Sequence, residues 1–258
     1  MPAAATDPTP PRPVLLVTGG GRGIGAAVAL MAAARGYDLC LTYRSDTARA
    51  EATAAAARQS GAEVLAIQAD VAEPADRDRC FAALDARFGR LDALVNNAGI
   101  TGPTGRLEDT PDAVWEQVLR TNVIGTIACT RAAIARMSTR HGGRGGAIVN
   151  VSSRASTLGG GGEWVHYAAS KGAVDTLTLG LARELALEGI RVNAVNPGLI
   201  ETELHAAAGL PDRVARLSSG VPMQRGGSAE EVAEPILWLL SAAASYITGV
   251  CLPVGGGR

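Results

Sequence analysis

The sequence predicts a doubly wound α/β fold, a parallel sheet of about seven strands with helices on both faces. Two observations carry this prediction. Short segments that are apolar at nearly every residue alternate along the chain with segments long enough for helices of several turns, the pattern of a parallel sheet covered on both faces. The first apolar segment also runs straight into a glycine-rich turn and a helical pattern.

Strand and helix units follow one another from residue 14. The expected strands are residues 14–18, 38–43, 63–69, 91–96, 147–152, 191–196 and 250–254. The expected helices are residues 24–35, 47–60, 74–88, 111–137, 167–188 and 229–241. Gly36 and Gly61 follow helical stretches, where a residue with positive φ closes the helix end. Thr110 is expected to cap the fourth helix, with Pro111 at its first position.

The remaining stretches are expected to be irregular. Residues 142–146, 159–162 and 203–227 lack periodicity and are candidates for mobile loops. Residues 1–13 are rich in Pro and Ala, and we expect a flexible tail there. Residues 14–258 are expected to form a single domain, because no internal repeat or second hydrophobic unit is found and one α/β domain can reach about 250 residues.

Composition excludes several classes of protein. The chain has 258 residues, 47% of them hydrophobic, and a net charge of −1, which is typical of a soluble globular protein rather than one that binds nucleic acid. Its 4 cysteines are far apart and form no CxxC, so we expect no metal site and no disulfides. No apolar run reaches the ~18 residues of a membrane helix and no signal peptide is found. We therefore expect a cytoplasmic protein without membrane contact.

The turn after the first strand reads Thr18-Gly19-Gly20-Gly21-Arg22-Gly23-Ile24-Gly25. Glycines let the backbone approach a pyrophosphate closely, and the free N–H groups of a helix start attract its charge. The alternative is a glycine-rich turn without a ligand, which the strand-turn-helix context disfavours. The cofactor contacts predicted here are Gly19, Gly21, Arg22, Gly23, Ile24 and Gly25.

Tyr167 and Lys171 are four positions apart and share one face of an expected helix. Lys171 is the only lysine among 24 basic residues, which indicates that this position needs an amine rather than a guanidinium. A phenol with a free pKa of about 10 is a poor acid or base near neutral pH. A nearby ammonium favours the phenolate, so we expect Lys171 to lower the pKa of Tyr167.

Several motifs, taken in the order in which they follow one another along the chain, resemble those of the short-chain dehydrogenase/reductase family. The glycine turn has its TGxxxGxG form, Asn96-Asn97-Ala98-Gly99 resembles its NNAG motif, and Tyr167 to Lys171 resembles its YxxxK pair. Each motif is weak alone, but the series over about 240 residues is specific. The resemblance implies a Rossmann-like fold and hydride transfer between a nicotinamide cofactor and a carbonyl or alcohol of a small organic substrate. It also implies a homotetramer or homodimer.

The resemblance implies a role for each motif residue. Tyr167 would be the acid/base, Ser153 would hold the substrate oxygen, Asn122 would support a water relay, and Lys171 would also reach the ribose of the nicotinamide. Further cofactor contacts are implied at Asp70, Val71, Asn97, Ala98, Gly99, Pro197, Gly198 and Thr202. No metal is implied.

The position of the serine departs from the family pattern, because Ser153 and Tyr167 are fourteen positions apart rather than the usual thirteen. The glycines at 159–162 can absorb one residue. Ser152 and Ser156 remain alternatives. Neighbours on a strand face opposite sides, so only one of Ser152 and Ser153 can face the site. We favour Ser153, because it ends its strand where such sheets bind ligands.

Cofactor choice is set at the end of the second strand, where a carboxylate would hold a free 2′-hydroxyl and an arginine a 2′-phosphate. This chain has Arg44 and Ser45 there. With Arg22 they could clamp the phosphate, which favours NADP(H). Two solvated arginines are the alternative, and the nearby Asp46 keeps NAD(H) open.

The motifs leave two other functions open. An NAD(H)-preferring sugar or polyol dehydrogenase and a non-catalytic NADP-sensing regulator are the alternatives; the intact catalytic set argues against the second. Residues 200–220, with the apolar Leu199, Leu204, Leu210 and Val214, are expected to form a lid over a partly apolar substrate. Glu163 and Trp164 are expected to pack or to edge the substrate pocket. His166 points about 100° away from Tyr167 on its helix, so we expect a pocket wall or a surface position.

Overall fold

The computed structural model describes residues 12–258, in which a seven-stranded sheet has the order β3-β2-β1-β4-β5-β6-β7. Every neighbouring pair of strands is parallel. The strands are β1 (Val14–Val17), β2 (Asp38–Tyr43), β3 (Val64–Gln68), β4 (Ala93–Asn96), β5 (Gly146–Val151), β6 (Ile190–Pro197) and β7 (Cys251–Val254). The predicted doubly wound parallel sheet is confirmed.

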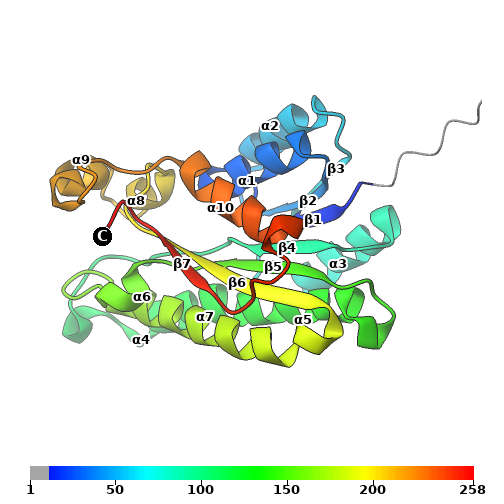
Figure 1. Ribbon diagram of the computed structural model, residues 1–258. Helices are drawn as coiled ribbons and strands as arrows, with labels where there is room; N and C mark the ends of the chain where they lie inside the picture. Colours follow the sequence, from blue (N-terminus) through cyan, green and yellow to red (C-terminus); the bar gives the residue numbers. More distant parts are fainter. Residues whose placement is uncertain (1–11) are drawn as a thin grey trace, which may run out of the picture.

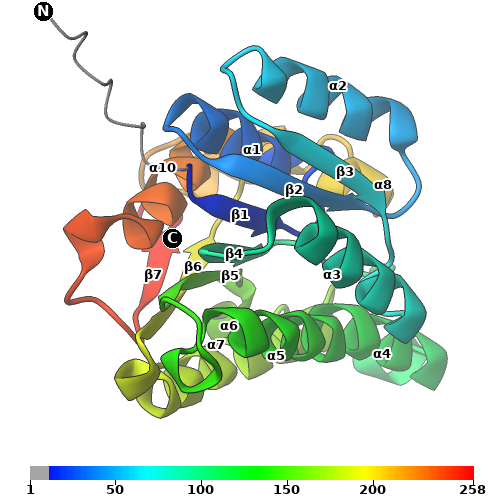
Figure 2. The same ribbon diagram turned by 90° about the vertical axis from the view of Figure 1, so that its right-hand side faces the viewer.

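Helices cover both faces of the sheet (Figures 1 and 2). On one face lie α1 (Gly23–Ala34), α2 (Thr47–Arg58) and α10 (Ala229–Leu240), and on the other α3 (Pro74–Phe88), α5 (Thr126–Met137) and α7 (Val165–Glu184). Alternate residues of β1 serve the two layers, because Leu15 and Val17 join the core under α1 and α10 while Val14 and Leu16 join the other. Both faces of β1 are thus buried, which explains why the strand is apolar throughout.

The expected helix at 111–137 is interrupted. It consists of α4 (Asp112–Leu119), a π-helical segment η2 (Arg120–Gly125) and α5. The predicted cap is wrong, because the Thr110 hydroxyl donates to the Arg106 carbonyl, and Pro111 precedes the helix in extended conformation. Thr110 is held by the short 3₁₀ turn η1 (Leu107–Asp109) before it, so its side chain is not available to the helix.

Short helices occupy parts of the stretches that lack periodicity. Within residues 203–227 these are α8 (Glu203–Ala207), α9 (Arg213–Leu217) and the 3₁₀ turn η5 (Ser218–Gly220). Outside the stretches expected to be irregular lie α6 (Ala155–Leu158) and the 3₁₀ turns η3 (Thr139–His141), η4 (Ala186–Glu188) and η6 (Ala242–Ala244). In Figure 1, α6, α8 and α9 lie at the same end of the sheet. Gly36 and Gly61 have φ of 89° and 74°, as predicted for helix ends.

The start of the chain is only partly described. Residues 1–11 of the expected tail at 1–13 lie outside the described residues. Arg12 donates to the carbonyls of Ala33 and Gly61, and the carbonyl of Pro13 accepts from Asp38. These two residues are therefore part of the fold rather than of a tail. Within residues 12–258, none of the helices combines the length and the apolar character needed to cross a membrane.

Candidate active site

A pocket of about 660 Å³ lies at the carboxyl ends of the strands. It opens beside β1 and β4, the neighbouring strands at which the strand order reverses, the usual ligand position in such sheets. The structure brings together most of the predicted site residues here: Gly19, Gly21, Arg22, Gly23, Ile24, Arg44, Ser45, Asp70, Val71, Asn97, Ala98, Gly99, Ser153, Tyr167, Lys171, Pro197, Gly198 and Thr202. Two predicted residues, Gly25 and Asn122, do not line the pocket.

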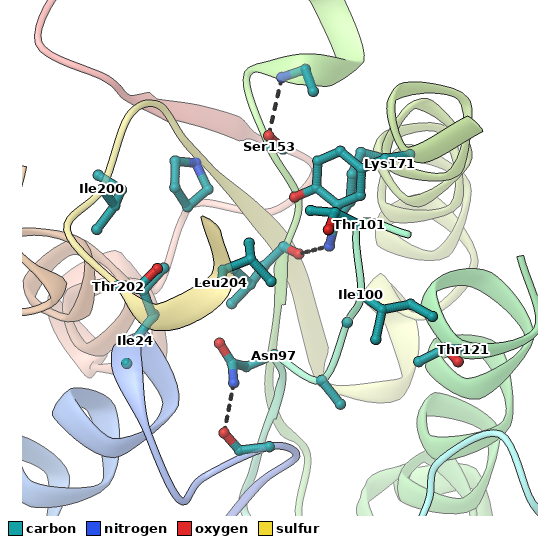
Figure 3. Close-up of a pocket in the computed structure, with 18 of the residues that line it drawn as sticks. Ile24, Asn97, Ile100, Thr101, Thr121, Ser153, Lys171, Ile200, Thr202 and Leu204 are labelled. Atoms are coloured by element: carbon teal, nitrogen blue, oxygen red, sulfur yellow. Dashed lines mark hydrogen bonds between the residues drawn. The ribbon is translucent and has the colours of Figure 1, made fainter. Parts of the chain in front are cut away.

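Gly25 lies beneath the glycine turn instead. A Cβ atom at this position would approach the Gly19 carbonyl oxygen to 2.2 Å and Asn97 Nδ2 to 2.5 Å. Asn97 Nδ2 donates to the carbonyls of Thr18 and Gly19, at 3.0 and 2.9 Å (Figure 3). Asn97 therefore fastens the glycine turn to the end of β4, and only a glycine at 25 leaves room for that contact.

The start of α1 offers an anion site. Arg22, its N-cap residue, makes no side-chain cap, and the first turn holds no acidic residue. Within residues 12–258, the first turn of the helix therefore has no side-chain cap, and its residues Gly23 and Ile24 line the pocket, as a bound pyrophosphate would require. Thr202 covers the turn from the other side, since a Cβ on Gly23 would lie 3.3 Å from Thr202 Cγ2 (Figure 3).

The end of β2 is basic in character. The side chains of Arg22 and Arg44 are exposed at the pocket edge, and neither forms an ion pair with a carboxylate of residues 12–258. Asp46, the one nearby carboxylate considered from sequence, is the N-cap of α2: its Oδ1 accepts from the Arg49 N–H, and its Oδ2 lies 3.3 Å from the Arg49 guanidinium. Asp46 is therefore already engaged by α2.

The three candidate serines occupy different environments. The Ser152 hydroxyl donates to the Lys171 carbonyl at 3.1 Å, which directs it to the backbone of α7. The Ser156 hydroxyl donates to the Ser153 carbonyl, and Ser156 is not among the pocket residues. Ser153 Oγ accepts from the Ala155 N–H and is close enough to Tyr167 to influence its pKa. The geometry favours Ser153, as the sequence did.

Tyr167 and Lys171 are both buried, at 9% and 5% exposure. The Lys171 ammonium donates to the Val151 carbonyl at 2.6 Å and lies 5.6 Å from the centre of the Tyr167 ring (Figure 3). Burial lowers the pKa of Lys171 to about 8, and the nearby Asp175 carboxylate opposes that shift.

The pKa of the Tyr167 phenol shifts in the direction opposite to our expectation. Burial raises it, and hydrogen bonding to Ser153 only partly offsets the effect. The expected lowering by Lys171 is not found, because desolvation of the phenolate dominates. Tyr167 is therefore a protonated phenol near neutral pH in this structure.

Asn122 acts from behind the pocket. Its Nδ2 donates to the Ile100 carbonyl and to Ser170 Oγ, and its Oδ1 accepts from the Ile100 N–H. These bonds use both Nδ2 hydrogens and one of the two acceptor positions of Oδ1. The expected role of Asn122 in a water relay stays a prediction. The Asn122 side chain thereby holds the segment after β4 against α7. A Cβ on Gly99 in that segment would lie 3.3 Å from Asn122 Oδ1 and 3.6 Å from Lys171 Nζ.

The residues around Tyr167 include some whose place the sequence did not reveal. His166 is buried at 1% exposure; its Nε2 bonds the Thr101 carbonyl, and its ring meets Trp115 edge-on at 5.9 Å. It is thus neither a pocket wall nor a surface residue. Glu163 and Trp164 do line the pocket, as does Arg213 from α9, which no motif singled out.

Known proteins with similar sequences are oxidoreductases. A family model described as enoyl-(acyl carrier protein) reductase matches residues 19–258. An uncharacterized oxidoreductase of Escherichia coli, YgfF, is 49% identical over 245 residues, covering 95% of this chain and 99% of its own. The 3-oxoacyl-[acyl-carrier-protein] reductase FabG of Staphylococcus aureus is 37% identical over 94% of this chain and 96% of its own.

Solved structures that are similar to this chain are also oxidoreductases. The acetoin dehydrogenase YohF of Salmonella typhimurium has a TM-score of 0.84 at 35% identity, over 95% of this chain and 96% of its own. A Burkholderia cenocepacia short-chain dehydrogenase in complex with NADP has a TM-score of 0.84 at 36% identity (94% and 96%). An NAD⁺-bound xylitol dehydrogenase has 0.85 at 33% identity (95% and 98%).

The fold and the site define a class of nicotinamide-dependent α/β enzymes. More particularly, the chain belongs to the short-chain dehydrogenase/reductase family, with which the match extends over nearly its whole length. It is an oxidoreductase of the kind that acts on CH–OH groups.

Proposed function

We propose that this protein is an NADP(H)-dependent oxidoreductase that interconverts a carbonyl and a secondary alcohol on a small organic substrate, with Tyr167 as acid/base. The observation that carries the proposal is one pocket that joins the start of α1, which has no side-chain cap, to Ser153 and the buried Tyr167 and Lys171. A nicotinamide cofactor supplies or accepts the hydride.

The chain's own residues divide the remaining work. In the reductive direction, a carbonyl oxygen beside Ser153 Oγ accepts a hydrogen bond from that hydroxyl and a proton from the Tyr167 phenol. The raised pKa of Tyr167 keeps this proton in place until it is needed. Lys171 holds a positive charge next to the phenol and therefore stabilises the phenolate that remains. Asn122 positions the backbone that encloses Lys171.

The preference for NADP(H) rests on two arginines and on one engaged carboxylate. Arg22 and Arg44 reach the pocket edge and form no ion pair with a carboxylate of residues 12–258, whereas Asp46 is bound to α2. A 2′-phosphate would pair with guanidinium groups, and a free 2′-hydroxyl would lack its usual carboxylate acceptor. The relatives include both an NADP complex and an NAD⁺ complex, so this chain's own charges decide the proposal.

The test is oxidation of NADPH over a panel of carbonyl compounds, with vicinal diketones, ketoses, cyclic diketones and β-ketoacyl thioesters, alongside NADP⁺ reduction over the matching alcohols. Turnover of at least one pair is expected. Ser153→Ala should then lower kcat by about 100-fold with cofactor affinity nearly unchanged, and the matched variant Ser152→Ala should lose far less. Cofactor binding without turnover of any pair would refute the enzyme and favour a nucleotide sensor.

A further inference from the structure

Arg213 is a buried charge that the mechanism above does not use. Among the residues whose burial the structure describes, only two charged ones are buried: Lys171 at 5% exposure and Arg213 at 7%. A buried charge is costly unless it is paired and hydrogen-bonded. Lys171 belongs to the catalytic cluster, so Arg213 requires a separate explanation.

The partners of Arg213 come from the loop that leads into the catalytic helix α7. Its Nη1 and Nη2 donate to the two carboxylate oxygens of Glu163 at 2.8 and 2.6 Å. The guanidinium carbon also lies 4.3 Å from the centre of the Trp164 ring. A two-pronged carboxylate pair combined with ring stacking requires the planar guanidinium fork, which a lysine cannot supply.

These contacts join two segments that lie far apart in the sequence. Arg213 begins α9 in the segment after β6, fifty positions beyond Glu163. On its other side α9 is seated against the loop before α10, since a Cβ on Gly226 would lie 2.5 Å from Val214 Cγ1. The orientation of α9 is therefore fixed by contacts on both sides.

The joined segments form the substrate end of the pocket. Leu204, Glu163, Trp164 and Arg213 all line it, and Figure 3 shows Leu204 pointing into it. The Trp164 ring meets the Tyr167 ring edge-on, with 6.5 Å between the ring centres. Trp164 thus contacts both Arg213 and Tyr167, so the position of Arg213 influences how Trp164 packs against the Tyr167 phenol.

We propose that Arg213 is a specificity-determining positioning residue, which closes residues 203–217 over the substrate and holds Trp164 against Tyr167. The inference rests on the proposed function, because it deepens the account of the same pocket. The bond from Arg213 lowers the pKa of Glu163, so the pair stays charged at neutral pH. Substrate affinity and size selectivity depend on Arg213, whereas cofactor binding at Arg22 and Arg44 does not.

The first test compares Arg213→Gln and Arg213→Lys with Arg216→Gln, a control because Arg216 is exposed on the same short helix and acts on Glu163 through its charge without the hydrogen bonds that Arg213 makes. Arg213→Gln should raise KM for a small ketone by about tenfold or more, with kcat within about threefold and NADPH affinity within about twofold. It should also reduce the preference for small over bulky carbonyls. Arg213→Lys should be intermediate, and Arg216→Gln should match the wild type.

A double-mutant cycle then separates the pair from the single residue. If the two side chains act together, Glu163→Gln and Arg213→Gln should raise KM by similar factors, and the double variant by no more than either alone. Unchanged KM and selectivity in folded Arg213→Gln would overturn the proposal, as would full additivity.

The second test does not depend on turnover. Hydrogen exchange of the backbone amides in residues 203–217 should be about tenfold faster in Arg213→Gln than in the wild type, and unchanged in Arg216→Gln. Exchange at the wild-type rate in Arg213→Gln would refute the closure. If the wild type reduces no carbonyl at all, the proposed function fails, but this measurement still decides whether Arg213 holds the segment.

Discussion

Arg44 presents an exposed guanidinium at the cofactor end of the pocket. Arg44→Asp would replace a partner for the 2′-phosphate with a carboxylate that accepts from a free 2′-hydroxyl. We expect the ratio of kcat/KM for NADPH over NADH to fall by about 100-fold, since both effects change it in the same direction. Arg58→Asp, on the far end of α2, is the control. A wild-type preference for NADH would contradict the assignment.

Lys171 titrates within an accessible pH range. Because burial lowers its pKa to about 8, the ammonium loses its proton above that pH, while the raised pKa of Tyr167 keeps the phenol protonated. The reductive kcat/KM should therefore be flat below about pH 8 and fall above it, and the apparent value belongs to the coupled pair.

Lys171→Arg should remove most activity, because a guanidinium keeps the charge but cannot occupy the ammonium's position at the Val151 carbonyl. Asp175→Asn should move the alkaline decline to lower pH, because this carboxylate supports the charge on Lys171. A profile measured on the three proteins would reject this interpretation if Lys171→Arg retained the wild-type rate and the same decline.

At the scale of elements, the glycine turn and the interrupted helix both serve the site. The π-helical segment places Asn122 against Ile100 and Ser170, and the close packing of Gly25 lets Asn97 hold the turn. The helix departs from regular α-helical structure at Asn122, and the turn lacks a side chain at Gly25. At both positions two parts of the site are in contact.

Gly25→Ala should therefore weaken cofactor binding and stability together. Its Cβ would lie 2.2 Å from a backbone oxygen, so the turn must move, at a cost of about 1–3 kcal/mol of overpacking. Gly180→Ala is the matched control in α7, where nothing lies within 4 Å, and it should be neutral or stabilising by up to about 1 kcal/mol. Thermal unfolding would measure the stability of both variants, and titration with NADPH would measure their cofactor affinity. Equal stability and equal affinity in the two variants would contradict the packing argument.

At the scale of the whole molecule, an assembly of copies stays a prediction. Ile124 on η2 and Leu179 on α7 are large apolar side chains that are 52% and 46% exposed, and both lie in the helical layer of α3, α5 and α7, which could form a subunit contact. We expect a homotetramer by light scattering, and Leu179→Arg should yield smaller species because a charge would be buried at the contact. Ala55→Arg on α2 is the control. A monomeric wild type would refute the expectation.

The sequence by itself determined the sheet, the glycine turn and the pairing of Tyr167 with Lys171. These follow from local patterns: apolar strands buried on both faces, a turn that needs glycine, and four-residue spacing on one helix. Alternation along a strand, which is also local, indicated that only one of Ser152 and Ser153 faces the site; the choice of Ser153 stays a prediction.

Only the tertiary structure decided how distant residues use their polar groups. Asn122 bonds to Ile100, burial reverses the expected pKa shift of Tyr167, and Arg213 bonds to Glu163. Hydrogen bonds and desolvation depend on which groups meet in space, and for Arg213 and Glu163 the partners are fifty positions apart in the chain. No local sequence pattern indicates such a contact, so the residues at the substrate end of the pocket could be identified only from the folded structure.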